Sequence, residues 1–159
     1  VRSRRQRQMC IRDRINTTYK GLCEKIEAKP YGIQSVAQAV IDIRSAKLPN
    51  PSQIGNCGSF FRNPVISEKQ FVELQQQYPN MPHYPDQEGK IKIPAAWLID
   101  HLGYKGYRKN DAGVHQNQAL VLVNYGNASG AEIKKLAQVI KDKVIENFAI
   151  SLGFEVNIL

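Results

Sequence analysis

A continuous apolar run, LVLVNY, occupies residues 120–125 and precedes a long amphipathic segment. A short apolar run of this kind is best interpreted as a buried strand. Ser129 and Glu132 then have the spacing of a capping box, which predicts the start of a helix. The residues that this helix would bury recur at helical spacing: Ile133, Leu136, Ala137, Ile140 and Val144. A buried strand followed by an amphipathic helix predicts a mixed fold, of class α+β or α/β.

A capping box also predicts a helix near the start of the chain. Ser35 and Gln38 have the required spacing, and Pro49 and Pro51 would end the helix. Its apolar face would carry four residues: Val36, Ala37, Val40 and Ile41. This helix precedes the main part of the chain.

A third capping box, Ser67 with Gln70, predicts a helix that buries Phe71 and Leu74. Residues 78–90 are rich in Pro, Tyr, Asp and Gly and are predicted to be a loop. Residues 154–158 alternate between apolar and polar side chains, which predicts a strand with Glu155 on its non-core face.

The net charge of +8 is concentrated in residues 1–14, VRSRRQRQMCIRDR, which hold +5 of it. The remaining chain carries only +3, so its charge is no sign of a nucleic-acid partner. Three interpretations of this tail are open: a nucleic-acid-binding arm, a solvated leader, and a translated piece of sequencing-adapter DNA. We favour the third. It would place the start of the natural sequence near Ile15 and make the chain a fragment.

Composition excludes several other classes. No run of about 18 apolar residues exists, so neither a transmembrane helix nor a membrane partner is expected. Three widely spaced cysteines argue against a disulfide scaffold and fit a reducing cytosol. His83, His101 and His115 lack metal-site spacing, so no metal is expected. The Rossmann, P-loop and G-x-S-x-G fingerprints are absent from the sequence.

The segment most suggestive of a site is GNCGSFFRNP, at residues 55–64. Glycines permit backbone conformations and close ligand approach that other residues do not. Ser59, placed between them and two phenylalanines, could present its hydroxyl group to a ligand. From the residues alone, a glycine-rich turn that enters a strand is an equally good interpretation.

This segment, preceded by IRSAKLPNP at residues 43–51, resembles the UDP-N-acetylenolpyruvoylglucosamine reductase (MurB) family in its type I branch. Three further motifs follow in the family's order: AAWLIDHLGYKG at 95–106, GVHQNQALVLVN at 113–124 and FEVNIL at 154–159. A glycine–serine loop alone would be a weak signal. Five ordered motifs that span nearly the whole chain after Ile15 are a strong one.

The resemblance implies an α+β fold in three parts. Residues 1–14 are a basic tail outside the family, 15–48 the helical end of the flavin-binding region, and 49–159 the C-terminal substrate-binding domain. The resemblance also implies a cytoplasmic oxidoreductase of peptidoglycan synthesis that depends on FAD and NADPH. Its substrate would be UDP-N-acetylglucosamine enolpyruvate, which is reduced to UDP-N-acetylmuramate. Most FAD contacts would come from a flavin-binding domain missing from this chain, so the isolated fragment should be inactive.

The resemblance also assigns two catalytic residues. The family's serine, which protonates C2 of the enol intermediate, matches Ser59, and its glutamate matches Glu155. The family's catalytic arginine would lie upstream of this chain. Two positions depart from the family pattern, since Cys57 replaces a small residue and Arg62 stands where lysine is common.

Seven positions match family residues near the substrate: Tyr19, Arg44, Lys47, Asn63, Tyr84, Lys105 and Gln118. Tyr84 matches the tyrosine of a substrate-closing lid, and a cationic pair such as Arg44 and Lys47 suits a diphosphate. Structural alternatives stay open: solvated charges for the lysines, loop packing for Tyr84, and a turn for Asn63. A free-standing UDP-sugar-binding module without a flavin partner is the alternative function.

Overall fold

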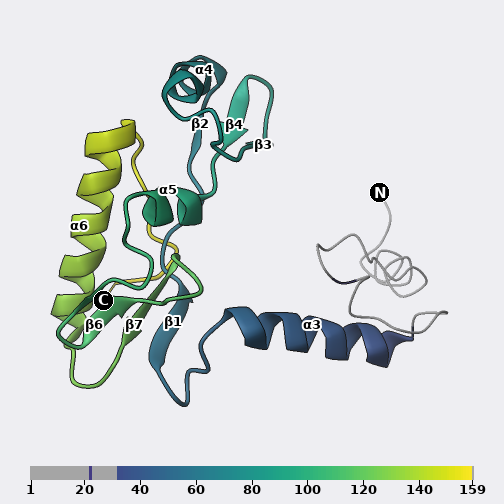
Figure 1. Ribbon diagram of the computed structural model, residues 1–159, viewed down its shortest axis with the longest axis vertical. Coiled ribbons are helices and arrows are strands. Elements are labelled where there is room, and N and C mark those ends of the chain that lie inside the picture. Colours follow the sequence, from purple (N-terminus) through teal and green to yellow (C-terminus); the bar gives the residue numbers. More distant parts are fainter. Residues whose placement is uncertain (1–21, 23–31, 159) are drawn as a thin grey trace. The chain divides into compact units, whose positions relative to one another are not determined.

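The computed structural model describes residue 22 and residues 32–158 of the chain. The chain divides into two compact units, Val1–Lys47 and Leu48–Leu159 (Figure 1). The tail at residues 1–14 and Tyr19 lie outside the described residues. The boundary between the two units falls at the end of the first described helix.

The first unit contains helix α3 (Ile33–Lys47), which ends just before Pro49, as predicted. The predicted capping box is wrong, because the helix begins two residues before Ser35, whose hydroxyl donates to the Gly32 carbonyl. The predicted apolar face is also shifted. Ala39 and Ile43 are buried with Leu22, and Val36 and Val40 are packed against them. These four positions of α3 follow the i, i+3, i+4, i+7 spacing of one helix face, which the predicted set did not.

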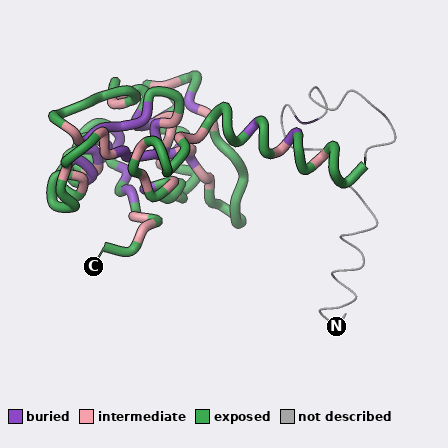
Figure 2. Tube along the Cα trace, turned by 90° about the horizontal axis from the view of Figure 1, so that it is seen from below, coloured by how far each residue is buried: buried purple, intermediate pink, exposed green. Residues whose placement is uncertain are grey.

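The second unit is built around a four-stranded antiparallel sheet with the order β1-β7-β6-β5. Its strands are β1 (Gly55–Ser59), β5 (Arg108–Lys109), β6 (Ala112–Val114) and β7 (Val121–Asn124). Strand β7 lies between β1 and β6, and its first three residues are buried. The strand predicted at residues 120–125 is therefore confirmed. Figure 2 shows how the buried positions gather in this part of the chain.

Helix α6 (Gly130–Phe148) packs against β6 and β7. Both hydrogen bonds of the predicted capping box are present: the Ser129 hydroxyl accepts from the Glu132 amide, and the Glu132 carboxylate accepts from the Ser129 amide. The helix buries Leu136, Ala137, Ile140, Val144 and Phe148, whereas Ile133 is only partly buried. The helix prediction is thus confirmed, except that Phe148 and not Ile133 belongs to the buried face. Helix α5 (Ala95–His101) also contacts α6.

A second, three-stranded antiparallel sheet has the order β2-β4-β3 and stands with helix α4 at one end of this unit (Figure 1). The elements are β2 (Val65–Ser67), α4 (Glu68–Gln77), β3 (Tyr84–Pro85) and β4 (Lys90–Lys92). Ser67 caps α4 as predicted, but the side chain of Gln70 donates to the carbonyl of Ala149 instead of closing the box. The region predicted as a loop contains β3, which pairs with β4.

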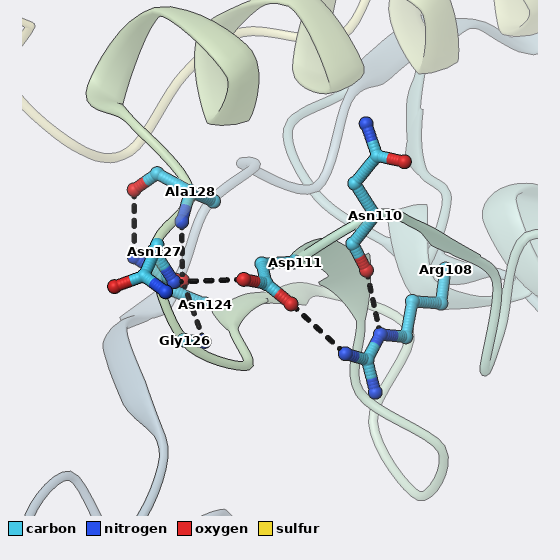
Figure 3. A network of polar contacts seen from close by, with 7 residues as sticks. All are labelled: Arg108, Asn110, Asp111, Asn124, Gly126, Asn127 and Ala128. Carbon is cyan, nitrogen blue, oxygen red and sulfur yellow. Dashed lines mark hydrogen bonds and ion pairs between the residues drawn. The ribbon is translucent and has the colours of Figure 1, made fainter.

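A polar network ties the β5–β6 hairpin to the turn between β7 and α6 (Figure 3). Asp111 accepts hydrogen bonds from the Arg108 guanidinium at 3.0 Å and from the Asn127 amide at 2.9 Å. These bonds lower the pKa of the Asp111 carboxyl, the Asn127 amide most of all. Asn124 closes the turn, because its side chain both donates to and accepts from the backbone of Ala128. The network holds the end of β7 against the start of α6.

Candidate functional site

The segment GNCGS forms strand β1 with an irregularity at its centre. The register against β7 shifts between Asn56 and Ser59, and Gly58 has a φ of 76°. The Asn56 side chain supports this bend by accepting a hydrogen bond from the Gly58 amide at 3.1 Å. Glycine suits this position because its φ lies in the left-handed region. Ser59 follows as the last residue of the strand and is exposed.

The chain beyond Ser59 is held on both sides by backbone hydrogen bonds. The Phe60 amide donates to Leu120 at 2.8 Å, and the Phe60 carbonyl accepts from the Glu155 amide at 2.9 Å. Ser59 and Glu155, which are 96 positions apart, therefore lie on directly neighbouring segments. The backbone alone brings the two predicted catalytic residues into one region.

Glu155 does not lie on a regular strand, so the strand predicted at residues 154–158 is wrong. Only an isolated antiparallel bridge between Phe61 and Phe154 forms there. The rings of Phe60, Phe61 and Phe154 pack together, with centroids between 5.4 and 5.9 Å apart. This aromatic cluster anchors Phe154 without a ladder of strand hydrogen bonds. Val156 is partly buried against the core, and Ile158 is exposed.

Arg62 is a site residue that the sequence did not predict. Its Nε lies 2.8 Å from Oε2 of Glu155, and the two side chains are 65% and 55% exposed. The Arg62 amide also donates to the Gly153 carbonyl at 2.9 Å. The ion pair joins positions 93 residues apart, which no local pattern can reveal. The sequence contained one indication of Arg62: it lies three residues after Ser59, at a position where lysine is common in the family.

Asn63 caps helix α5 from outside the helix. Its Oδ1 accepts a hydrogen bond from the Ala95 amide at 2.9 Å. Pro94, the N-cap residue, makes no side-chain capping bond, and Ala95 is fully buried. The Ala95 amide would otherwise be a buried donor without a partner. Asn63 thus has a structural role, which leaves its amide nitrogen for any contact with a ligand.

We expect Asn63→Ala to destabilise the protein by about 1–2 kcal/mol, because the buried Ala95 amide loses its acceptor. Asn63→Asp keeps an acceptor oxygen at this position and serves as the control, with a smaller expected loss. Urea unfolding followed by the fluorescence of the single tryptophan, Trp97, measures both. Equal midpoints for Asn63→Ala and the wild type would contradict the capping role.

Three other predicted binding residues lie on separate elements of the second unit. Tyr84 is on β3, is 60% exposed, and lies opposite Lys92 in the sheet. Lys105 follows α5 and forms an ion pair with Asp100 at 2.9 Å. Gln118 lies in the turn just before β7, three positions before Val121, the register partner of Ser59. Gln118 therefore lies on the chain segment that pairs with Ser59, whereas Tyr84 and Lys105 lie on other segments.

Arg44 and Lys47 belong to the last turn of α3 in the first unit, and both are exposed. Cations in this position are favoured by the negative end of the helix dipole. Their spacing of three residues places them on one face of the helix. The two residues thus present like charges on one face of α3, and their contact with a diphosphate stays a prediction.

Cys57 borders a hollow of about 580 Å³. The lining residues come from β1, the start of α6 and the end of the chain: Cys57, Phe60, Gly130, Ala131, Ile133, Lys134, Val156, Asn157 and Ile158. Partial burial raises the pKa of the Cys57 thiol, although a hydrogen bond from its own backbone opposes the shift. A raised pKa disfavours the reactive thiolate form of this side chain.

Histidines form no metal site in the described part of the chain. His83 packs on Phe71 with ring centroids 4.4 Å apart, and His101 stacks on Trp97 at 4.7 Å. His115 is buried, which lowers its pKa. No group of three potential metal ligands occurs among the residues that the structure describes. Within the same residues, no helix is both long enough and apolar enough to span a bilayer.

Residues 50–159 match the family model described as UDP-N-acetylenolpyruvoylglucosamine reductase, C-terminal domain. The chain belongs to this reductase family. It is 46% identical over 148 residues to the UDP-N-acetylenolpyruvoylglucosamine reductase of Porphyromonas gingivalis, which covers 92% of this chain and 44% of the relative. The reductase of Amoebophilus asiaticus is 48% identical over 148 residues, covering 91% of this chain and 44% of that protein.

The chain therefore spans less than half the length of these curated relatives of the reductase family. The crystal structure of the reductase from Thermus caldophilus is 22% identical, with a TM-score of 0.45, and covers 78% of this chain and 34% of that chain. Ser59, Arg62 and Glu155 all lie inside the region that matches the reductase's C-terminal domain. Arg44 and Lys47 precede it.

Proposed function

We propose that this chain is the C-terminal part of an enzyme that reduces UDP-N-acetylglucosamine enolpyruvate to UDP-N-acetylmuramate in peptidoglycan synthesis. The single observation that carries the proposal is the hydrogen bond from the Glu155 amide to Phe60, which sets Glu155 beside the segment that follows Ser59. The match to the reductase's C-terminal domain supports the choice of reaction. A cytoplasmic location fits a reaction that uses a nucleotide sugar.

FAD and NADPH would be held mainly by a flavin-binding part of the protein outside this chain. Among the described residues, no buried side-chain polar atom lacks a hydrogen-bond partner. The sequence also contains no glycine-rich dinucleotide fingerprint. Within the C-terminal part, the chemistry open to the residues is proton transfer and the stabilisation of charge on the substrate.

Ser59 is the proposed proton donor to C2 of the substrate. A serine hydroxyl is a very weak acid, so it can give up its proton only to a strongly basic, enolate-like carbon. Such a carbon arises when hydride has been added at C3 of the enol ether. Ser59 is exposed at the end of β1, and no hydrogen bond of its hydroxyl occupies it within the described residues. The hydroxyl can therefore meet a bound substrate.

Glu155 is proposed to orient or stabilise the intermediate, together with an arginine from the flavin-binding part. Its Oε2 is bonded to Arg62, and its Oε1 has no hydrogen-bond partner in the described part of the chain. One carboxylate oxygen is thus held while the other can face the substrate. Fixed charges of this kind act most strongly where water is excluded.

The remaining residues are proposed to bind the nucleotide sugar. Arg44 and Lys47 would contact the diphosphate, and Lys105 and Gln118 the nucleotide. Lys105 would have to exchange its ion pair with Asp100 for the ligand. Tyr84, exposed on a short strand, would belong to a lid that closes over the substrate. Tyr19 and the amide nitrogen of Asn63 complete the proposed set.

The proposal is tested with the protein expressed from the complete gene. We expect a yellow flavoprotein that oxidises NADPH rapidly only when UDP-N-acetylglucosamine enolpyruvate is present. Mass spectrometry of the product should show a gain of two hydrogen atoms. A colourless protein that binds the UDP-sugar without turnover would favour a binding module instead.

We expect Glu155→Gln to lower kcat by about 100-fold, because one preorganised charge at the intermediate is lost. The reduction of the flavin by NADPH should be unchanged, since Glu155 acts after that step. Stopped-flow absorbance separates the two half-reactions. Glu146→Gln, an exposed glutamate on α6, is the matched control and should behave as wild type. Equal losses in both half-reactions would contradict the assigned role.

A further inference from the structure

We propose that Arg62 is a positioning residue that fixes the carboxylate of Glu155 for the reaction. This inference rests on the proposed function. It adds to the site a cation from the C-terminal part of the protein, distinct from the arginine expected upstream. The contact that carries it is the 2.8 Å bond between Nε of Arg62 and Oε2 of Glu155.

Backbone hydrogen bonds hold the segments of Arg62 and Glu155 next to each other, independently of the two side chains. The Arg62 amide donates to Gly153, and the Glu155 amide donates to Phe60, both at 2.9 Å. The two bonds flank the bridge between Phe61 and Phe154. The backbone contacts therefore fix the positions of the two main chains. The ion pair adds to them only by selecting the rotamer of the Glu155 side chain.

The rotamer of Glu155 needs such a partner. The side chain is 55% exposed, so packing does not restrict it, and a glutamate has several torsions to order. The bond to Arg62 uses one nitrogen and one oxygen, so it selects one orientation of the carboxylate and leaves Oε1 available for a substrate contact. Catalysis depends steeply on this kind of placement.

A purely structural role for the ion pair does not fit its surroundings. Exposed ion pairs contribute little to folding, and both partners here are more than half exposed. The bridge itself is held by backbone hydrogen bonds and by the rings of Phe60, Phe61 and Phe154. Removal of the Arg62 charge should therefore leave the fold intact and affect Glu155 alone.

The test uses the enzyme from the complete gene with four variants: Arg62→Gln, Arg62→Lys, Glu155→Gln, and Arg62→Gln combined with Glu155→Gln. We expect Arg62→Gln to lower kcat about tenfold with little change in KM. Arg62→Lys should recover most of the loss, because it restores one charged donor. In the Glu155→Gln background, Arg62→Gln should have no further effect, since its target is gone.

Other readouts separate positioning from folding. The unfolding midpoint and the rate of flavin reduction should match wild type in Arg62→Gln, and crystals of this variant should show Glu155 in several rotamers. Lys143→Gln, which removes a similarly exposed ion pair on α6, is the control and should keep full activity. The inference is overturned by a wild-type kcat in Arg62→Gln, by a further loss in the Glu155→Gln background, or by a single unchanged Glu155 rotamer.

Failure of the proposed function gives a different pattern. If the wild-type enzyme itself does not turn over the UDP-sugar, the reaction is wrong whatever Arg62 does. The crystallographic comparison of Arg62→Gln with wild type then still decides whether Arg62 positions Glu155. An unchanged Glu155 would overturn the inference, and a disordered one would support the positioning role.

Discussion

Replacement of Ser59 by alanine should lower the rate of product formation by about 1,000-fold in the enzyme from the complete gene. The loss follows from the proposed role, because the substrate carbon would lack its proton donor at the end of β1. NADPH should still reduce the flavin at the wild-type rate, since proton donation to the substrate comes later. Rapid mixing with and without the UDP-sugar measures the two steps separately.

The fold should tolerate this change. Ser59 is exposed, and the neighbouring backbone bonds from Phe60 and Glu155 do not involve its hydroxyl group. Ser151→Ala, another exposed serine in the same unit, is the matched control and should retain full turnover. Normal product formation by Ser59→Ala would refute the proton-donor role, and loss of both half-reactions would indicate a structural one.

Replacement of Phe148 by alanine should have the largest effect on stability, about 3–5 kcal/mol. Phe148 is 1% exposed at the end of α6, and its ring packs against Tyr78, Trp97 and His101. Truncation removes the apolar contacts and leaves a cavity between α5, α6 and the segment after α4. Denaturant unfolding followed by circular dichroism gives the change in free energy.

Ile145→Ala is the control for this experiment. It lies three residues earlier on the same helix but is 45% exposed, so its truncation should cost less than about 1 kcal/mol. Trp97 provides a second signal, because its ring centroid is 6.1 Å from that of Phe148. Similar losses of unfolding free energy in the two variants would contradict the prediction that the buried Phe148 ring contributes most to the packing of α6.

The parts of the fold that were predictable depend on local signals. Strand β7 was visible as an apolar run, and α6 as a capping box followed by apolar residues at helical spacing. The N-cap of α4 at Ser67 was equally local. The errors arose where tertiary contacts outweighed such signals. The Gln70 side chain bonds to Ala149, 79 positions away, and the alternating segment after Gly153 forms a single bridge.

The candidate site divides in the same way. Ser59 and Glu155 could be selected from their motifs, although their roles in the reaction stay predictions. Neither their proximity nor the partners of Glu155 and Asn63 could be read from the sequence. Those contacts join Arg62 to Glu155 over 93 positions and Asn63 to Ala95 over 32 positions. Such pairings depend on how the elements pack, and no periodicity encodes them.

Local patterns in the sequence predicted a mixed fold with a helix and a strand at its centre, because capping and periodicity act over a few residues. The ordered motifs indicated the family and, through it, the α+β class. The buried face of α3, the capping of α5 by Asn63 and the ion pair between Arg62 and Glu155 became visible only in the tertiary structure. These features rest on hydrogen bonds and ion pairs between distant segments. Such bonds form only after the backbone of the sheet and the aromatic cluster have brought their partners within reach.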